Sequence, residues 1–249
     1  MTLHPLAEHF AGVADAYERG RPEYAPAVVG ALSAELGLLA GARVLDLAAG
    51  TGKLTRALLA GGLDVVAVEP QAAMRERLAR EVGGERALDG LAEAIPLADA
   101  SVDAVTVADS FHWFDHAPAL VEIARVLRPR GGLAVLATMP DWSGASWAHE
   151  VGELMQRTRP EHPAFDGPPW QQALAGADGW SRPREIRVSS SAAADPHRLL
   201  DYLVSMSWVA ALPERERAAM LAQIEALVLD GSTPPELGVH VVIGLAQRL

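Results

Sequence analysis

A glycine turn flanked by two carboxylates is the part of this sequence whose residue types and spacing could do chemistry. An apolar run at residues 43–47 contains Asp46, and the turn Gly50-Thr51-Gly52 follows it closely. A second apolar run at residues 65–68 is followed by Glu69. Each run is typical of a buried strand, so the two acids are expected at neighbouring strand ends. A small turn with acidic side chains there predicts a site for a nucleoside-like cofactor.

The glycine pattern separates this site from two common phosphate-binding loops. A dinucleotide fold requires Gly-x-Gly-x-x-Gly, and Thr55 stands where the third glycine is needed. Lys53 follows Gly52 too early for a Walker-type loop. Asp46 would repel a pyrophosphate but suits a cationic ligand group, and Glu69 is placed to accept both hydroxyls of a ribose.

The elements that must position these residues alternate between strand and helix from residue 43 to about residue 138. Apolar runs predict strands at residues 44–47, 65–68, 102–108 and 133–137. Helical spacing predicts helices at residues 53–60, 71–82 and 117–127, the last ended by Pro129 and the glycines after it. Strands that are apolar on both faces indicate a parallel sheet covered by helices, which binds ligands beyond the carboxyl ends of its strands.

The last hundred residues have a different composition. Residues 140–183 hold four tryptophans among many prolines and glycines, with a short helical pattern at residues 145–155. Asp195 and Pro196 are typical of a helix start. The other expected elements are a strand at residues 184–188, a helix from Pro213 to before Gly231, and a closing strand at residues 239–243. We interpret this half as an elaboration of one domain.

Composition limits the classes of partner. Lys and Arg number 21 and Asp and Glu number 32, so the net charge of −11 disfavours a nucleic-acid partner. The chain has no cysteine, which excludes disulfides and thiolate metal sites. No carboxylate cluster stands out by its spacing, so no metal site is predicted. The first residues lack a secretory signal, and no apolar stretch is long enough to span a membrane. We therefore expect a soluble, cytoplasmic protein without a membrane partner.

Several segments together resemble the class I S-adenosylmethionine (SAM)-dependent methyltransferases. Residues 44–52 (VLDLAAGTG) resemble the first motif of this family, and residues 65–70 (VVAVEP) resemble its ribose-binding motif, with Met74 where an apolar residue packs on the adenine. Residues 111–114 (FHWF) and 21–24 (RPEY) resemble its small-molecule, Methyltransf_11-like branch. Further matches lie at residues 92–97, 101–105 and 119–132, and the resemblance spans residues 10–138.

The resemblance implies a fold and a domain organisation. The fold is α/β, Rossmann-like and doubly wound, with a mostly parallel seven-stranded sheet, an antiparallel C-terminal strand and a helical cap over the site. Residues 1–249 would be a single domain, with N-terminal lid helices at 1–40, a SAM-binding core at 41–138 and a substrate-cap elaboration at 139–249. The protein would be a monomer or a homodimer.

The resemblance also implies the cofactor-binding residues. Alanine at position 48 departs from the family, which often has glycine there, and Leu91 replaces a polar residue expected near the adenine amine. Adenine recognition would then depend on backbone groups around Leu91 and Ala92. The implied set is Asp46, Ala48, Gly50, Gly52, Glu69, Pro70, Met74, Leu91, Ala92, Glu93, Asp109, Tyr17 and Arg21.

Each assignment has a plainer alternative. Asp46 could cap the following helix, and Glu69 or Asp109 could be acids at solvated loop ends. His112 could accept a proton from the methyl acceptor, or could pack in its loop. Four tryptophans, Trp113, Trp142, Trp147 and Trp208, would line the acceptor pocket, although any one alone could be a core residue.

The expected activity is methyl transfer from SAM to an O, N or C atom of a small molecule, giving S-adenosylhomocysteine by in-line displacement. Two alternatives stay open at this point. One is a SAM-binding protein without catalysis, and the other is a nicotinamide-dependent oxidoreductase on a similar sheet.

Overall fold

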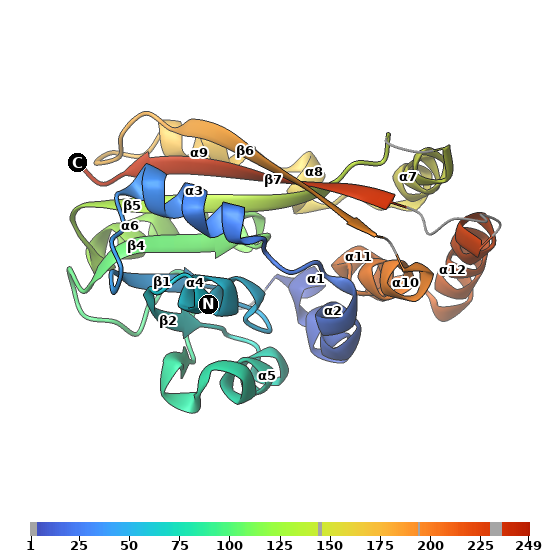
Figure 1. Ribbon diagram of the computed structural model, residues 1–249, viewed down its shortest axis with the longest axis horizontal. Coiled ribbons are helices and arrows are strands. Elements are labelled where there is room, and N and C mark those ends of the chain that lie inside the picture. Colours follow the sequence, from blue (N-terminus) through green and yellow to red (C-terminus); the bar gives the residue numbers. More distant parts are fainter. Residues whose placement is uncertain (1–3, 144–145, 194, 230–235) are drawn as a thin grey trace. The chain divides into compact units, whose positions relative to one another are not determined.

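The strands of the computed structural model form a mixed sheet in the order β3-β2-β1-β4-β5-β7-β6 (Figure 1). The structure describes residues 4–143, 146–193, 195–229 and 236–249. Strands β1 to β5 pair in parallel, and β7 runs antiparallel to its neighbours. This confirms the mostly parallel seven-stranded sheet predicted from the sequence. The strands are β1 Arg43–Leu47, β2 Asp64–Val68, β3 Ala87–Leu88, β4 Val102–Ala108, β5 Leu127–Pro140, β6 Arg184–Ala193 and β7 Glu236–Gln247.

The helices agree with the sequence patterns where those patterns are periodic. The helix predicted at residues 53–60 is α4. The helix predicted at 71–82 is α5, which starts one residue later, and the helix predicted at 117–127 is α6, which starts and ends one residue earlier. The α-helices are α1 Pro5–Glu8, α2 Ala14–Gly20, α3 Pro26–Leu36, α4 Lys53–Ala60, α5 Ala72–Val82, α6 His116–Val126, α7 Ser146–Thr158, α8 Pro163–Asp166, α9 Trp170–Ala175, α10 Pro196–Val204, α11 Ser207–Ala210 and α12 Glu214–Leu229. The 3-10 helices are η1 His9–Gly12, η2 Gly84–Arg86 and η3 Phe111–Trp113.

The chain divides into two compact units, which are described separately. The sheet unit comprises Glu23–Thr138, Asp166–Val188 and Val241–Leu249. The helical unit comprises Met1–Pro22, Met139–Phe165 and Ser189–His240.

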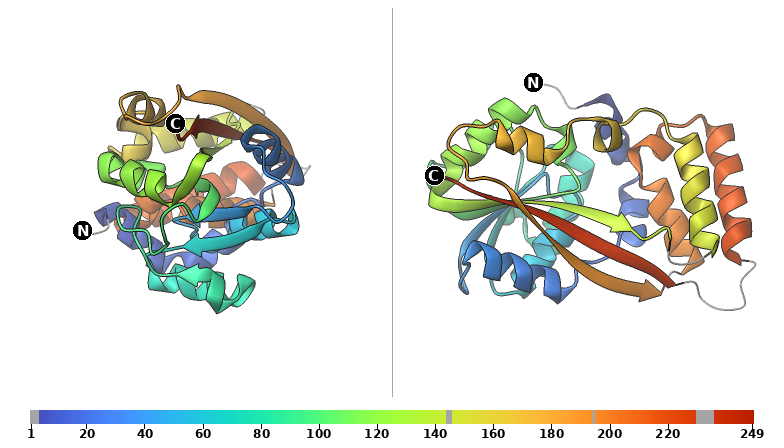
Figure 2. Two further views of the ribbon diagram at one scale, coloured as in Figure 1. Left: turned by 90° about the vertical axis from the view of Figure 1, so that its left-hand side faces the viewer. Right: turned by 90° about the horizontal axis from the view of Figure 1, so that it is seen from above.

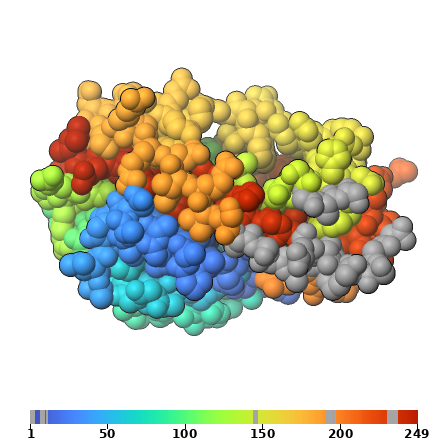
Figure 3. All heavy atoms as spheres, turned by 45° about the horizontal axis from the view of Figure 1, so that its top comes forward, coloured from blue at the N-terminus to red at the C-terminus, as the bar shows by residue number. Residues whose placement is uncertain are grey.

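The sheet unit is a three-layer structure with helices on both faces of the sheet (Figure 2). Alternation along β1 turns Leu45 and Leu47 toward the face covered by α6 and α9, and Val44 toward the face covered by α3 and α4. Residues 26–36, grouped with a lid in the sequence analysis, form α3 and pack on the sheet instead. On the surface, Arg184 of β6 pairs with Glu35 of α3, and atoms of these two elements lie side by side (Figure 3).

Strand β5 begins much earlier than its apolar run predicts. Leu127 follows α6 directly and pairs with Val102, and the next paired residues are Gly132 and Ala104. The residues between Leu127 and Gly132 form a bulge in which Arg130 has a φ of 66°. A Cβ on Gly131 would lie 2.9 Å from the carbonyl oxygen of residue 103, so glycine is needed there. The predicted turn is therefore a bulge inside the strand.

The helical unit has its own apolar core, built by α7, α10, α11 and α12. Helix α2 approaches α10 so closely that a Cβ on Gly20 would lie 2.1 Å from the backbone nitrogen of Tyr202. Asp195 caps α10 as predicted, because its Oδ1 accepts a hydrogen bond of 2.8 Å from the backbone N–H of His197. Helix α12 spans Glu214–Leu229 and buries Ile224 and Val228; Gly231, its expected limit, lies outside the described residues.

Two searches of the described residues gave negative results. None of the helices there has the length and apolar character needed to cross a membrane. Within the same part of the chain, no group of three or more His, Asp or Glu side chains is arranged to hold a metal ion.

Candidate cofactor site at the strand ends

The turn after β1 and the end of β2 meet through Glu69. The register pairs Leu47 with Val68, so the residues that follow the two strands are neighbours. The backbone N–H of Gly50 donates to Oε2 of Glu69 at 2.8 Å, and the N–H of Gln71 donates to Oε1 at 2.9 Å. Two residues predicted separately from the sequence are thereby brought together, and each carboxylate oxygen retains a second lone pair.

The charge of Glu69 is shaped by its burial. Only 5% of the residue is exposed. Burial raises the pKa of Glu69 to about 7, against the lowering effect of the N–H groups of Gln71 and Gly50 and of the Arg75 charge. The carboxylate therefore titrates close to neutral pH.

Asp46 lies on β1, in the interior of the sheet unit. It is completely buried, and Oδ2 accepts a hydrogen bond of 2.6 Å from the hydroxyl of Thr55 in α4. Oδ1 accepts another, of 3.2 Å, from Thr106 on β4. Burial raises the pKa of Asp46 to about 6, although both hydroxyls lower it. These contacts support the alternative in which Asp46 fixes the start of α4; its contact with a cationic ligand stays a prediction.

The turn itself has a backbone that favours glycine. Gly50 has a φ of 59° and Gly52 a φ of 90°. A Cβ on Gly52 would lie 2.6 Å from Cδ1 of Leu78, so the turn also packs closely on α5. Ala48 has a φ of 56°, in the left-handed region that costs a residue with a Cβ about 1–2 kcal/mol. The glycine that the family often has at this position therefore has a conformational reason.

Asp109 directly follows β4, just as Ala48 directly follows β1. Its backbone has a left-handed φ of 52°. Its Oδ1 accepts a hydrogen bond of 2.7 Å from the N–H of Thr138, and its Oδ2 accepts one of 3.3 Å from the hydroxyl of Tyr24. Ser110 joins the two strand ends, because its hydroxyl lies 3.4 Å from the carbonyl of Ala48. Tyr24 belongs to the motif at residues 21–24 but was not predicted from the sequence as a site residue.

His112 and Trp113 lie in η3, directly after this end of β4. Their rings are tilted against each other with centroids 4.4 Å apart. The preceding residue, Phe111, is buried and stacks on His116 at 4.6 Å. Phe111 and His116 thus anchor the segment that presents His112 and Trp113.

The loop between β3 and β4 carries Leu91, Ala92 and Glu93. Ala92 is buried, and Leu91 is half-buried and forms an isolated bridge with Ala94. Oε1 of Glu93 accepts a hydrogen bond of 2.9 Å from the N–H of Asp115, at the start of α6. This bond gives Glu93 a structural partner, and its contact with the cofactor stays a prediction.

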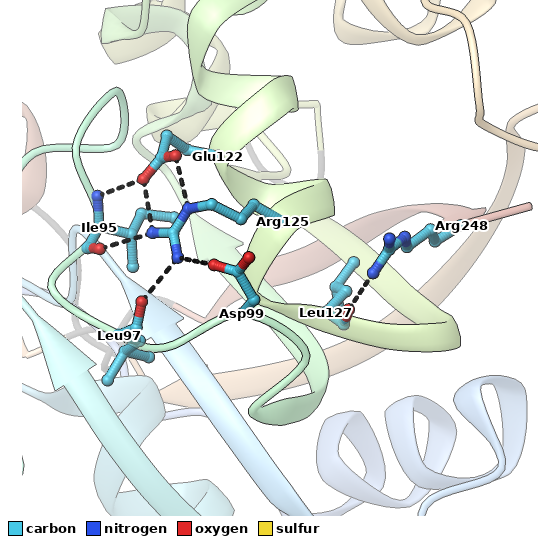
Figure 4. Close-up of polar contacts among 7 residues, drawn as sticks. All are labelled: Ile95, Leu97, Asp99, Glu122, Arg125, Leu127 and Arg248. Carbon is cyan, nitrogen blue, oxygen red and sulfur yellow. Dashed lines mark hydrogen bonds and ion pairs between the residues drawn. The ribbon is translucent and has the colours of Figure 1, made fainter.

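Arg125 of α6 holds the second half of this loop (Figure 4). Its guanidinium donates to the carbonyl oxygens of Ile95 and Leu97, at 2.9 and 2.8 Å. It also pairs with Asp99 at 2.8 Å and with Glu122 at 2.7 Å. This role was not predicted from the sequence, because Ile95, Leu97 and Asp99 lie 30, 28 and 26 residues before Arg125.

Other predicted residues have the following surroundings. Pro70 is half-buried, and Met74 in the first turn of α5 is 3% exposed. In the helical unit, the guanidinium of Arg21 lies between the rings of Tyr17 and Tyr202, at 5.1 and 4.8 Å, and donates to Ser205 at 3.0 Å.

The other predicted pocket residues are also in the helical unit. Trp208 is buried in its core, and Trp142 and Trp147 pack against that core. These contacts support the core alternative for the three tryptophans.

A groove of about 800 Å³ lies elsewhere in the sheet unit, between α6 and α9. Leu120, Val121 and Trp180 contribute to its apolar wall, and Arg248 lies at its edge. None of the residues predicted to bind the cofactor lines this groove. The site predicted from the sequence is therefore a separate feature, at the ends of β1, β2 and β4.

Comparison with known proteins shows what the whole chain is similar to. A family model described as a methyltransferase domain, Methyltransf_11, matches residues 45–135. An uncharacterised methyltransferase of Mycobacterium tuberculosis (strain ATCC 25618 / H37Rv) is 38% identical over 219 residues, covering 88% of this chain and 85% of the relative. A demethylmenaquinone methyltransferase of Thermus thermophilus is 44% identical over 110 residues, 41% of this chain and 50% of that protein.

A solved methyltransferase structure has a similar fold. The structure, assigned as a type II methyltransferase from Anaeromyxobacter dehalogenans, superposes with a TM-score of 0.64 at 26% identity. The match covers 92% of this chain and 97% of the other.

The sheet order and these similarities define an enzyme of the class I methyltransferase type, whose cofactor is SAM. The chain belongs to the SAM-dependent methyltransferase family. Neither the nicotinamide alternative nor the non-catalytic one agrees with this membership.

Proposed function

We propose that this enzyme transfers the methyl group of SAM to an O, N or C atom of a small molecule, with the cofactor ribose bound by Glu69. The observation that carries the proposal is the Glu69 carboxylate, held by the N–H groups of Gly50 and Gln71 beside a left-handed turn. Its remaining lone pairs are suited to the two adjacent hydroxyls of a ribose. The residues present therefore fit the cofactor.

The other cofactor contacts are proposed from their position around Glu69. The turn at Ala48, Gly50 and Gly52 would lie along the amino-acid part of the cofactor. Leu91 and Ala92 would meet the adenine through backbone groups. The contacts proposed for Asp46, Pro70, Met74, Glu93, Asp109, Tyr17 and Arg21 rest on the family resemblance.

The chemistry demands little of the protein beyond positioning. The sulfonium of bound SAM supplies an activated leaving group. The residues at the ends of β1 and β2 would hold the cofactor so that the acceptor can approach its methyl group. Alignment of the acceptor within about 3 Å supplies much of the acceleration. We assign His112 as the group that takes the acceptor's proton, with Trp113 beside it as a wall of the acceptor pocket.

Two observations support a small-molecule acceptor. The net charge of −11 opposes a nucleic-acid substrate. The Thermus relative is named for demethylmenaquinone, which is a small molecule.

Calorimetry and methyl transfer test the proposal together. S-adenosylhomocysteine should bind with one site per chain, whereas NAD should not bind. Transfer of a radiolabelled methyl group is then measured against small O, N and C nucleophiles, with bulk protein and nucleic acid as competing acceptors. Label recovered only in protein or nucleic acid would overturn the small-molecule assignment.

A further inference from the structure

Arg75, in the first turn of α5, contacts three acceptors around the end of β2. Its Nη1 donates to the carbonyl oxygens of Glu69 and Pro70, at 2.8 and 2.9 Å. The same nitrogen lies 3.0 Å from Oδ1 of Asp89, which follows β3. The Arg75 side chain is 22% exposed, so these contacts are partly shielded from water.

The backbone that carries the Glu69 side chain is hydrogen-bonded at both its carbonyl and its N–H. The carbonyl oxygens of Glu69 and Pro70 accept hydrogen bonds from the Arg75 side chain. The N–H of Glu69 donates to the carbonyl of Leu88 at 3.0 Å. With the backbone fixed in this way, the carboxylate meets the N–H groups of Gly50 and Gln71.

The charges around Glu69 come from three elements. Arg75 on α5 lowers the pKa of Glu69, and Asp46 on β1 raises it. Asp89, after β3, pairs with Arg75 and partly offsets its positive charge. Arg75 therefore opposes the effect of burial, which by itself favours the protonated acid.

We propose that Arg75 is a positioning residue, which holds Glu69 in the orientation and the ionised state that ribose binding requires. The inference rests on the proposed function of Glu69. It predicts that Arg75 affects cofactor affinity without touching the cofactor.

The test is the dissociation constant of S-adenosylhomocysteine measured from about pH 5.5 to pH 9. In the unaltered protein the affinity should rise with pH through a midpoint near neutrality, as Glu69 ionises. Arg75→Gln should weaken binding about tenfold at pH 7 and raise the midpoint by about 0.5 pH unit or more, since one pH unit corresponds to about 1.4 kcal/mol. Arg75→Lys retains the charge on a side chain one atom shorter than the one whose Nη1 reaches the three acceptors, so its midpoint should stay near that of the unaltered protein while its affinity falls at every pH.

Two further variants serve as a control and as an independent test of the Arg75 charge. Arg80 lies on the same helix in an exposed ion pair with Glu76, so Arg80→Gln is a matched control that should reproduce the unaltered curve. Asp89→Asn removes the partner of Arg75 but leaves the arginine, so its midpoint should move down, opposite to Arg75→Gln. It also gives a readout if Arg75→Gln does not fold.

An unchanged midpoint and affinity in Arg75→Gln would overturn the inference, as would a midpoint that rises in Asp89→Asn. If the proposed function itself is wrong, the binding measurements give a different result. In that case the unaltered protein either does not bind S-adenosylhomocysteine or binds it with no dependence on pH near neutrality.

Discussion

The backbone N–H of Gly50 donates a 2.8 Å hydrogen bond to the carboxylate of Glu69, and this bond joins the ends of β1 and β2. Parallel pairing makes the contact possible, because Leu47 and Val68 are in register, three residues before Gly50 and one residue before Glu69. The turn and the acid therefore form one structural unit.

Glu69→Ala should weaken binding of S-adenosylhomocysteine by about 1–3 kcal/mol, the cost of losing hydrogen bonds to a buried ribose. Glu69→Gln retains one acceptor and should have an intermediate effect. Calorimetry measures both, and Glu76→Ala, exposed on the following helix, is the matched control. If Glu69→Ala and Glu76→Ala bind equally well, Glu69 is not the ribose acceptor.

Ala48→Gly should raise the free energy of unfolding by about 0.5–1 kcal/mol. The substitution relieves the strain of a φ of 56°, which outweighs the extra chain entropy of glycine in the unfolded state. Urea denaturation measures the change. Ala49→Gly, one residue later and without a positive φ, should instead destabilise the protein by about 0.5–1 kcal/mol. The prediction is wrong if both variants lose stability.

Asp46→Asn should reduce the loss of stability between about pH 4 and pH 7. The pKa of Asp46 is raised from 3.8 to about 6 in the folded protein, so the folded state binds the proton more tightly than the unfolded state. The unfolding free energy therefore falls as pH rises through this window, and the share of Asp46 is about 3 kcal/mol. Denaturation of Asp46→Asn and of the unaltered protein at pH 4 and pH 7 should show the smaller difference in the variant. A difference equal to that of the unaltered protein would mean that the pKa is not raised.

Arg125→Gln should lower the free energy of unfolding by about 2 kcal/mol, because the carbonyl oxygens of Ile95 and Leu97 and two carboxylates lose charged donors. Arg128, three residues later, makes an exposed ion pair with Asp103. Arg128→Gln should therefore change stability by only about 0.5 kcal/mol. Equal losses in urea denaturation would show that Arg125 does not hold the loop.

His112→Ala should lower kcat about 100-fold at neutral pH and leave the affinity for S-adenosylhomocysteine unchanged, if His112 removes the acceptor's proton. Single-turnover methyl transfer with the acceptor identified in the library measures the effect. His149 is an exposed histidine on α7, so His149→Ala should retain full turnover. Full turnover in His112→Ala would instead favour a packing role beside Trp113.

Much of the sheet unit could be predicted from local patterns. Residues 102–108 form the expected strand, and residues 53–60 form the expected helix, because apolar periodicity and glycine turns act over short distances. The order of these elements also placed Gly50 and Glu69 at adjacent strand ends. The bulge in β5 was misread as a turn, since the pairing of Leu127 with Val102 depends on a distant strand.

By itself, the sequence determined the family, the cofactor and the order of strands and helices, because each is encoded by residues close together in the chain. Only the tertiary structure decided where the acidic side chains point. Asp46 turns inward because Thr55 and Thr106, 9 and 60 residues away, supply its donors. Asp109 acquires Tyr24 and Thr138 in the same way. Such partners are separated by long stretches of chain, and only folding brings their hydrogen-bonding groups within 3.5 Å of one another.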